Sequence, residues 1–109
     1  MNISLIVSIV RKGWGNRALD ASIDAGASGG TLLFGRGTGV HENETIMGIP
    51  IEPEKEILLT IAPTETVVKI MNAIARACEL DKPRAGVAFV VPIDKVMGAI
   101  HLSSPAKSL

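Results

Sequence analysis

The sequence has very little of several features that commonly decide function. It contains one cysteine, Cys78, among 109 residues, which excludes a disulfide framework and a multi-cysteine metal site. Its 11 lysines and arginines are balanced by 11 acidic residues without a basic stripe, which argues against general nucleic-acid binding. No apolar run reaches the roughly 18–20 residues that span a bilayer. Residues 1–12 lack the charged leader and cleavage site of a signal peptide, so we expect a cytoplasmic protein.

Aromatic residues are also scarce, whereas aliphatic residues are abundant. Aromatic side chains make up 3% of the chain and tyrosine is absent, yet 47% of the residues are apolar and the mean hydropathy is +0.35. A chain of 109 residues forms one domain, and such a small body has little interior for so much aliphatic surface. Either part of this surface is exposed, or subunits of an oligomer cover it for one another. The composition therefore favours an oligomer.

Hydrophobic periodicity divides the chain into six regular elements and one long loop. Runs of β-branched residues that end at glycine indicate strands, and apolar residues four apart indicate helices. The helix that begins at Pro63-Thr64-Glu65 has the clearest pattern, with Thr64 as its predicted cap. Pro92 cannot donate to a sheet ladder, so it predicts a bulge, a bend or a sheet edge in the last strand. The predicted elements are strands at 2–10, 29–34, 56–62 and 85–100, helices at 14–27 and 64–79, and a loop without periodicity at 40–53.

The order of these elements is β-α-β-β-α-β. Two interleaved right-handed crossovers of this kind build an α+β, ferredoxin-like sandwich, in which a four-stranded antiparallel sheet carries both helices on one face. The other face of the sheet is then bare and aliphatic, and several subunits that pack these faces together would bury it. We expect a domain at 1–102 and a loose, polar C-terminal tail at 103–109.

Two segments have the composition of anion-binding loops. In Gly35-Arg36-Gly37-Thr38-Gly39 the backbone amides can face a phosphate with Arg36 as charge partner; the alternative is a flexible hinge at the base of the loop. Neither a P-loop nor a dinucleotide motif is present. In Asp81-Lys82-Pro83-Arg84-Ala85-Gly86, Lys82 and Arg84 can hold an anion, and the alternative is an ordinary solvated linker.

Other chemistry has weaker support in the sequence. A metal site could draw on His41, Glu42, Glu44 and His101, but their spacing resembles no zinc motif. Cys78 lies on the apolar face of the second helix and is predicted to belong to the core. There is no Ser/His/Asp set and no carboxylate pair with catalytic spacing, so we expect a protein that is not an enzyme.

The order of elements, together with several local motifs, resembles the P-II signal-transduction family over residues 3–100. The resemblance implies homotrimers of ferredoxin-like subunits that bind adenine nucleotides, such as ATP or ADP, in the clefts between subunits. Many members also sense 2-oxoglutarate with Mg-ATP, and they regulate membrane transporters or enzymes of nitrogen metabolism by docking a mobile T-loop, here residues 40–54. The motifs are Gly26-x-x-Gly29-x-Thr31, Arg36-Gly37-Thr38-Gly39, Lys55 before a strand, Pro63-Thr64, and Gly86 before AFVVPIDKVMGA.

The resemblance also assigns ligand-binding roles to individual positions. Thr31 corresponds to the threonine near the adenine and Lys55 to the lysine that meets 2-oxoglutarate. Thr64 corresponds to the start of the second helix, near the base site. The glycines at the loop base and at the end of the phosphate-binding B-loop correspond to Gly37, Gly39 and Gly86.

The chain also departs from the family pattern. The B-loop lysine falls on Val87 and two C-terminal arginines fall on Gly98 and Ile100. Each missing charge-assisted contact is worth about 1.5–3 kcal/mol, and Lys82 and Arg84 compensate only in part. The glutamine that helps to hold Mg-ATP has no counterpart, and without tyrosine the uridylylation of some relatives is impossible. The chain therefore resembles a divergent member. The alternatives are a metal-tolerance trimer related to the CutA proteins and a structural trimer without a ligand.

Overall fold

The computed structural model describes residues 2–38, 44–47, 49–51 and 53–98. A four-stranded antiparallel sheet has the order β2-β5-β1-β6, and a two-stranded hairpin, β3 and β4, lies between β2 and β5 in the chain. The predicted four-stranded antiparallel sheet is therefore confirmed. The strands are β1 (Ile3–Arg11), β2 (Thr31–Arg36), β3 (Glu44–Ile46), β4 (Ile49–Ile51), β5 (Glu54–Pro63) and β6 (Gly86–Ile93).

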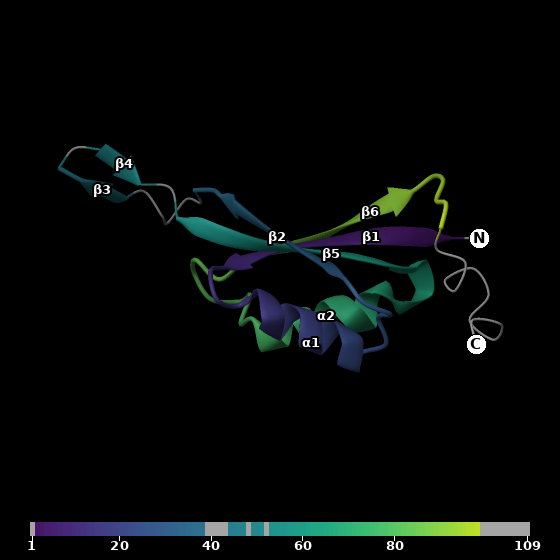
Figure 1. The fold of residues 1–109 in the computed structure, drawn as a ribbon. Coiled ribbons are helices and arrows are strands. Elements are labelled where there is room, and N and C mark those ends of the chain that lie inside the picture. Colours follow the sequence, from purple (N-terminus) through teal and green to yellow (C-terminus); the bar gives the residue numbers. More distant parts are fainter. Residues whose placement is uncertain (1, 39–43, 48, 52, 99–109) are drawn as a thin grey trace.

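Both helices cover the same face of the sheet, as predicted. They are α1 (Gly15–Asp24) and α2 (Val67–Ala77), the latter preceded by the 3-10 turn η1 (Thr64–Thr66), and Figure 1 shows both of them below the strands. The core lies between helices and sheet, where each buried aliphatic side chain contributes about 1.5–3 kcal/mol. Its largest fully buried apolar side chains are Ile6, Val10, Leu58, Ile70 and Ile74.

Small side chains let the helices approach the sheet and each other closely. Ala18 and Ser22 of α1 are fully buried, as is Ser8 of β1. Cys78, which follows α2, is also fully buried, and this burial raises the pKa of its thiol. The prediction that Cys78 belongs to the core is confirmed.

The opposite face of the sheet is aliphatic and lies away from both helices. Side chains alternate between faces along a strand, and the register brings the odd-numbered residues of β1, β5 and β6 together on this face. Ile61, Val87, Phe89 and Val91 are 38–50% exposed here. The prediction of a bare aliphatic sheet face is therefore confirmed. We call this surface the open face; its apolar residues include Leu5, Val7, Ile9, Leu33, Ile57, Leu59, Ile61, Val87, Phe89 and Val91.

The segment predicted as a loop without regular structure is partly a hairpin, so this prediction is wrong for β3 and β4. Glu44 pairs with Ile51 and Ile46 with Ile49, and Met47 in the turn has a φ of 53°. Figure 1 shows the hairpin beyond the end of the main sheet. Pro50 weighed against a strand, but a proline is tolerated in a two-stranded ribbon because one edge of each strand donates no ladder hydrogen bond.

The last strand is shorter than predicted. β6 ends at Ile93, and residues 94–98 are irregular. Pro92 lies in β6, which is an edge strand, so of the three alternatives predicted at this proline the structure shows the sheet edge. The predicted tail at 103–109 lies outside the described residues.

Candidate functional site

One end of the main sheet gathers most of the predicted binding residues. Lys55 at the start of β5 pairs with Arg11 at the end of β1 and with Gly35 near the end of β2. Gly86 at the start of β6 pairs with Val10. The chain enters and leaves the segment 37–53 at this end, which Figure 1 shows on the side of the hairpin.

A pocket of about 340 Å³ opens at this end. Three of its residues are cations, Lys12, Arg36 and Lys55, and one is an anion, Glu54, so its formal charge is positive. Lys55 is only 8% exposed, whereas Phe34 is 81% exposed and supplies an apolar wall. Two or more cations beside an apolar wall suit a small organic anion. The residues that line the pocket are Lys12, Phe34, Gly35, Arg36, Glu54 and Lys55.

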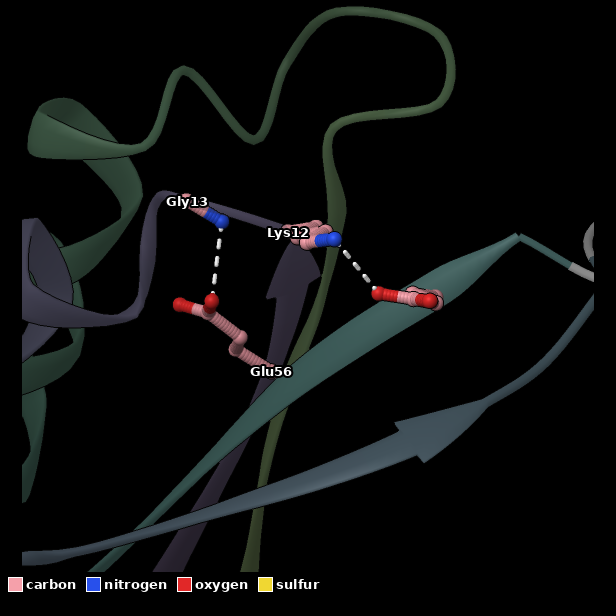
Figure 2. A network of polar contacts seen from close by, with 4 residues as sticks. Lys12, Gly13 and Glu56 are labelled. Carbon is pink, nitrogen blue, oxygen red and sulfur yellow. Dashed lines mark hydrogen bonds and ion pairs between the residues drawn. The ribbon is translucent and has the colours of Figure 1, made fainter.

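A polar network fastens the turn after β1 to the beginning of β5 (Figure 2). The Nζ atom of Lys12 lies 2.9 Å from Oε2 of Glu54. The side-chain hydrogen bond and the opposite charge raise the pKa of Lys12 and lower the pKa of Glu54. The carboxylate of Glu56 accepts hydrogen bonds from the backbone N–H of Gly13 at 2.9 Å and of Gly15 at 2.7 Å.

The base of the loop is closed by a backbone hydrogen bond. The N–H of Gly37 donates to the carbonyl oxygen of Pro53 at 3.2 Å, so the two strands of the loop meet directly beside the pocket. A side chain at Gly37 would contact the stem of Lys55. Gly39, the other predicted glycine of the loop base, lies outside the described residues.

The segment between α2 and β6 carries the second pair of predicted cations. Lys82 forms an ion pair with Glu79, with 2.6 Å between Nζ and Oε1, and Arg84 has a φ of 65°. Gly86 has a φ of 132°, and a Cβ atom here would collide with the carbonyl oxygen of Ile9. Glycine is therefore needed at this position for β6 to lie against β1.

Within one chain the structure does not bring the two predicted threonines to this end. Thr31 pairs with Leu59, four residues along β5 from Lys55, a distance of about 14 Å along an extended strand. Thr64 lies at the opposite end of the sheet, where its N–H donates to the carbonyl oxygen of Asn2.

The prediction that the Thr64 side chain caps the second helix is wrong. Its Oγ1 atom lies 2.8 Å from Oγ of Ser4, and the N-terminal ends of η1 and α2 have no side-chain cap. The reason is its position: Thr64 directly follows β5, whose pairing with β1 brings Ser4 opposite Ala62. The hydroxyl group of Thr66 donates a hydrogen bond to the carbonyl oxygen of Pro63 instead.

Sequence reasoning missed Lys12, Phe34 and Glu54. The split β-α-β topology places the end of β1 beside the start of β5, so a cation directly after the first strand must lie near Lys55. That signal was present in the sequence, since Lys12 follows the first strand immediately. Phe34 carries no such signal, because its exposure depends on how far β2 extends beyond the helices.

The positions where the chain departs from the expected binding pattern differ in their surroundings. Val87 is 50% exposed on the open face, Gly98 has a φ of 90°, and Ile100 lies outside the described residues.

No group of three or more His, Cys, Asp or Glu residues capable of holding a metal ion occurs in the described part of the chain. His41, Glu42 and His101 lie outside it.

Comparison with known proteins identifies the family of this chain. The family described as Nitrogen regulatory protein P-II matches residues 3–99, which is nearly the whole chain. The chain belongs to the P-II family. Members of this family are regulators rather than enzymes. No curated protein sequence is significantly similar to this chain.

Solved structures agree with this P-II assignment at the level of the fold. A PII protein from Arabidopsis thaliana bound to citrate has a TM-score of 0.72 and 19% identity, with 93% of this chain and 86% of that chain covered. GlnK from B. subtilis has a TM-score of 0.71 and 14% identity, with 89% and 90% covered. In the described ranges, neither helix of this P-II chain has the length and apolar character to cross a membrane.

Proposed function

We propose that this P-II protein is a homotrimeric regulator that controls a partner protein through residues 40–54, and that a small anionic ligand at the end of the sheet governs this loop. The single observation that carries the proposal is the pocket of Lys12, Arg36 and Lys55 beside the hydrogen bond from Gly37 to Pro53. A ligand held there contacts Arg36, which precedes the loop, and Lys55, which follows it. It can therefore bias the loop between states for which its affinity differs.

The proposed ligand is an adenine nucleotide. Arg36 and Lys55 supply charge for its phosphates. Lys82 and Arg84 precede Gly86, which begins β6 beside β1. Thr31 and Thr64 lie too far from Lys55 to share its ligand within one chain, so we assign them, with Gly37 and Gly39, to a cleft completed by a neighbouring subunit. The neutral Val87 weakens this site, and we expect lower affinity than a full set of cations would give. Mg and 2-oxoglutarate have less support, because the glutamine that helps to hold Mg-ATP has no counterpart here.

The proposed trimer is supported by the open face. Val87, Phe89 and Val91 of β6 are partly exposed there, and subunits that pack these faces together remove apolar surface from water. We place the protein in the cytoplasm and propose a membrane transporter or an enzyme of nitrogen metabolism as its partner.

Isothermal titration of the purified protein with ATP, ADP, AMP, citrate and 2-oxoglutarate tests the ligand. Citrate is included because the similar Arabidopsis thaliana protein binds it. We expect a nucleotide to bind and Lys55→Gln to weaken it about tenfold or more, since a hydrogen bond to a charged group is worth about 1.5–3 kcal/mol. Lys69→Gln, at an exposed position of α2, is the matched control and leaves the affinity unchanged.

The outcome separates the remaining alternatives. Binding of no nucleotide at millimolar concentration overturns the nucleotide proposal and leaves a structural trimer, which the neutral residue at Val87 favours. A ligand that protects residues 39–53 from hydrogen exchange supports control of the loop. Binding without any change in that segment overturns the proposed control.

A further inference from the structure

The outer surface of the helix layer carries charges of both signs. This surface lies on the side of the sheet away from the open face (Figure 1). Asp20 and Asp24 are exposed on α1, and Lys69 and Arg76 are exposed on α2. None of these four side chains forms an ion pair with another described residue. The outer surface is therefore acidic along residues 20–24 of α1 and basic along residues 69–76 of α2.

A groove of about 580 Å³ lies on this surface along α2. The residues that line it include two cations, Lys69 and Arg76, and one carboxylate, Glu65, so its formal charge is positive. Val68, which is 70% exposed, adds an apolar side chain. A groove that is positively charged and partly apolar suits a helix that carries carboxylates and an aliphatic side chain on one face.

The outer side of α1 has this complementary pattern. Asp20 and Asp24 are one helical turn apart, and Ile23, which is 45% exposed, lies between them in the sequence and on the same side of the helix. Lys69 and Arg76 of α2 are two turns apart, about 10 Å along the helix axis. Charge complementarity therefore identifies the occupant that the chain itself can supply for the groove, which is α1 of a second copy.

The direction of the helices decides how two copies fit. Sγ of Cys78, which follows α2, lies 3.9 Å from the carbonyl oxygen of Trp14, which precedes α1, whereas Ala25, which follows α1, lines the groove together with Val68 near the start of α2. The two helices therefore run antiparallel. A twofold axis parallel to the helices places α1 of each copy on α2 of the other. A twofold axis across the helices places α1 on α1 and brings carboxylates together, so the charges select the first arrangement.

We propose that two copies of this chain pack their helix layers face to face, so that the carboxylates of α1 in each copy meet the cations of α2 in the other, Asp20 and Asp24 with Lys69 and Arg76. The symmetry forms each contact twice and removes the exposed aliphatic side chains of both helices from water. Since the helices have only 10 and 11 residues and exposed ion pairs are weak, the association is weak and reversible.

This contact is independent of the proposed function. It uses the side of the sheet opposite the open face, and it needs neither a ligand nor residues 40–54. A trimer formed through the open face leaves its helix layers on the outside, so the contact then joins one trimer to another. If the open face forms no trimer, the same contact joins two monomers. At micromolar concentration the weak contact is dissociated, so assembly through the open face is measured separately.

Light scattering of the full-length protein at increasing concentration tests the contact. In about 0.1 M sodium chloride we expect the weight-average mass of the wild type to rise about 1.5-fold or more between about 10 μM and about 1 mM. Sodium chloride at about 1 M should abolish most of this rise, because it screens exposed charges over a few ångströms. Association that is independent of salt would overturn the role given to the charges.

A charge exchange between the two helices tests which surfaces meet. Asp20→Lys/Asp24→Lys makes α1 basic, and Lys69→Glu/Arg76→Glu makes α2 acidic, so neither variant should associate with itself. An equimolar mixture should recover the rise in mass, because each variant then offers the other opposite charges at both contacts. A mixture that stays at the mass of its separate components would overturn the proposal.

A matched variant separates the effect of position from that of net charge. Asp81→Lys/Asp94→Lys changes two exposed residues outside both helices and has the same net charge as Asp20→Lys/Asp24→Lys. It should associate as the wild type does, and adding Lys69→Glu/Arg76→Glu should not increase its mass beyond that of the variant alone. Equal loss of association in the two lysine variants would show that net charge alone is responsible, and would overturn the proposal.

Two further measurements complete the test. Circular dichroism checks the fold of each variant. If a charge-reversed variant is unfolded, the neutral Asp20→Asn/Asp24→Asn decides, since it should weaken the association and an unchanged mass curve would contradict the contact. Oligoglutamate of ten residues is titrated into the wild type as an acidic peptide. Binding of this peptide by a wild type that does not associate with itself would assign the groove to another acidic partner and overturn the proposal of a second copy.

Discussion

The carboxylate of Glu56 in β5 accepts a hydrogen bond from the backbone N–H of Gly15, the first residue of α1, with 2.7 Å between Oε1 and N. The first N–H groups of a helix have no partner within the helix, and α1 has no side-chain cap of its own. A strand residue 41 positions away thus satisfies the start of the helix and ties it to the sheet. A Cβ atom at Gly15 would collide with this carboxylate.

The first prediction concerns this bond. Glu56→Gln replaces one acceptor oxygen by an NH₂ group that faces a backbone N–H, so we expect the free energy of unfolding to fall by about 1–3 kcal/mol. Urea denaturation followed by circular dichroism measures it. Glu65→Gln, at an exposed position, is the matched control and should change stability by less than about 0.5 kcal/mol. Equal effects in the two variants would show that the bond to Gly15 contributes nothing.

The second prediction concerns the start of β6. Gly86→Ala adds a Cβ atom that would collide with the carbonyl oxygen of Ile9 and also strains a backbone at φ 132°, so we expect a loss of about 3 kcal/mol or more. Gly29→Ala, where a Cβ atom would meet nothing within 4 Å, is the control. Urea denaturation compares the two. A stable Gly86→Ala protein would mean that β6 can pair with β1 in another way.

The third prediction concerns the ion pair between Lys12 and Glu54. Because Lys12 lowers the pKa of Glu54 from its ordinary 4.5, the pair stabilises the fold above that pH and the contribution is lost as the pH falls through the lowered pKa. Lys12 has the opposite pH dependence, because its pKa is raised. Its contribution to stability is complete below pH 10.5 and is lost as the pH rises through the raised pKa.

A carboxyl titration by NMR checks this pair directly. In Lys12→Gln the pKa of Glu54 should rise toward its ordinary value, whereas Lys69→Gln should leave it unchanged. Sodium chloride at high concentration should have the same direction of effect as Lys12→Gln, because both charges are at the surface and are screened. An identical Glu54 titration in wild type and Lys12→Gln would contradict the ion pair.

Much of the fold was predictable because periodicity and topology constrain each other. The buried positions Ile70 and Ile74 repeat every four residues, and the alternation along β1 leaves one face aliphatic. The order of elements then admits few arrangements. The hairpin at β3 and β4 was not predictable in the same way, since its three-residue strands are too short for periodicity and Pro50 lies within one of them.

The candidate site was predictable only in part. Arg36 was proposed from the glycine-rich segment and Lys55 from the family resemblance, and both line one pocket in the structure. The prediction that Thr64 caps the helix is wrong because its hydroxyl group forms a hydrogen bond with the hydroxyl group of Ser4, a residue 60 positions away in sequence. Such a contact depends on strand register, which local patterns do not determine. The contact between the Glu56 carboxylate and the start of α1 also depends on how strands and helices pack, so local patterns do not predict it either.

The last prediction concerns the open face and the proposed trimer. Val91→Asp places a charge among partly exposed apolar residues of β6, and burial of an unpaired carboxylate at a subunit interface is costly. We expect sedimentation equilibrium to give three times the chain mass of 11.4 kDa for wild type and a smaller assembly for Val91→Asp. Val68→Asp is the matched control, because Val68 is 70% exposed on α2, in the helix layer on the other side of the sheet. A wild-type monomer at micromolar concentration, or equal dissociation of both variants, would rule out assembly through the open face.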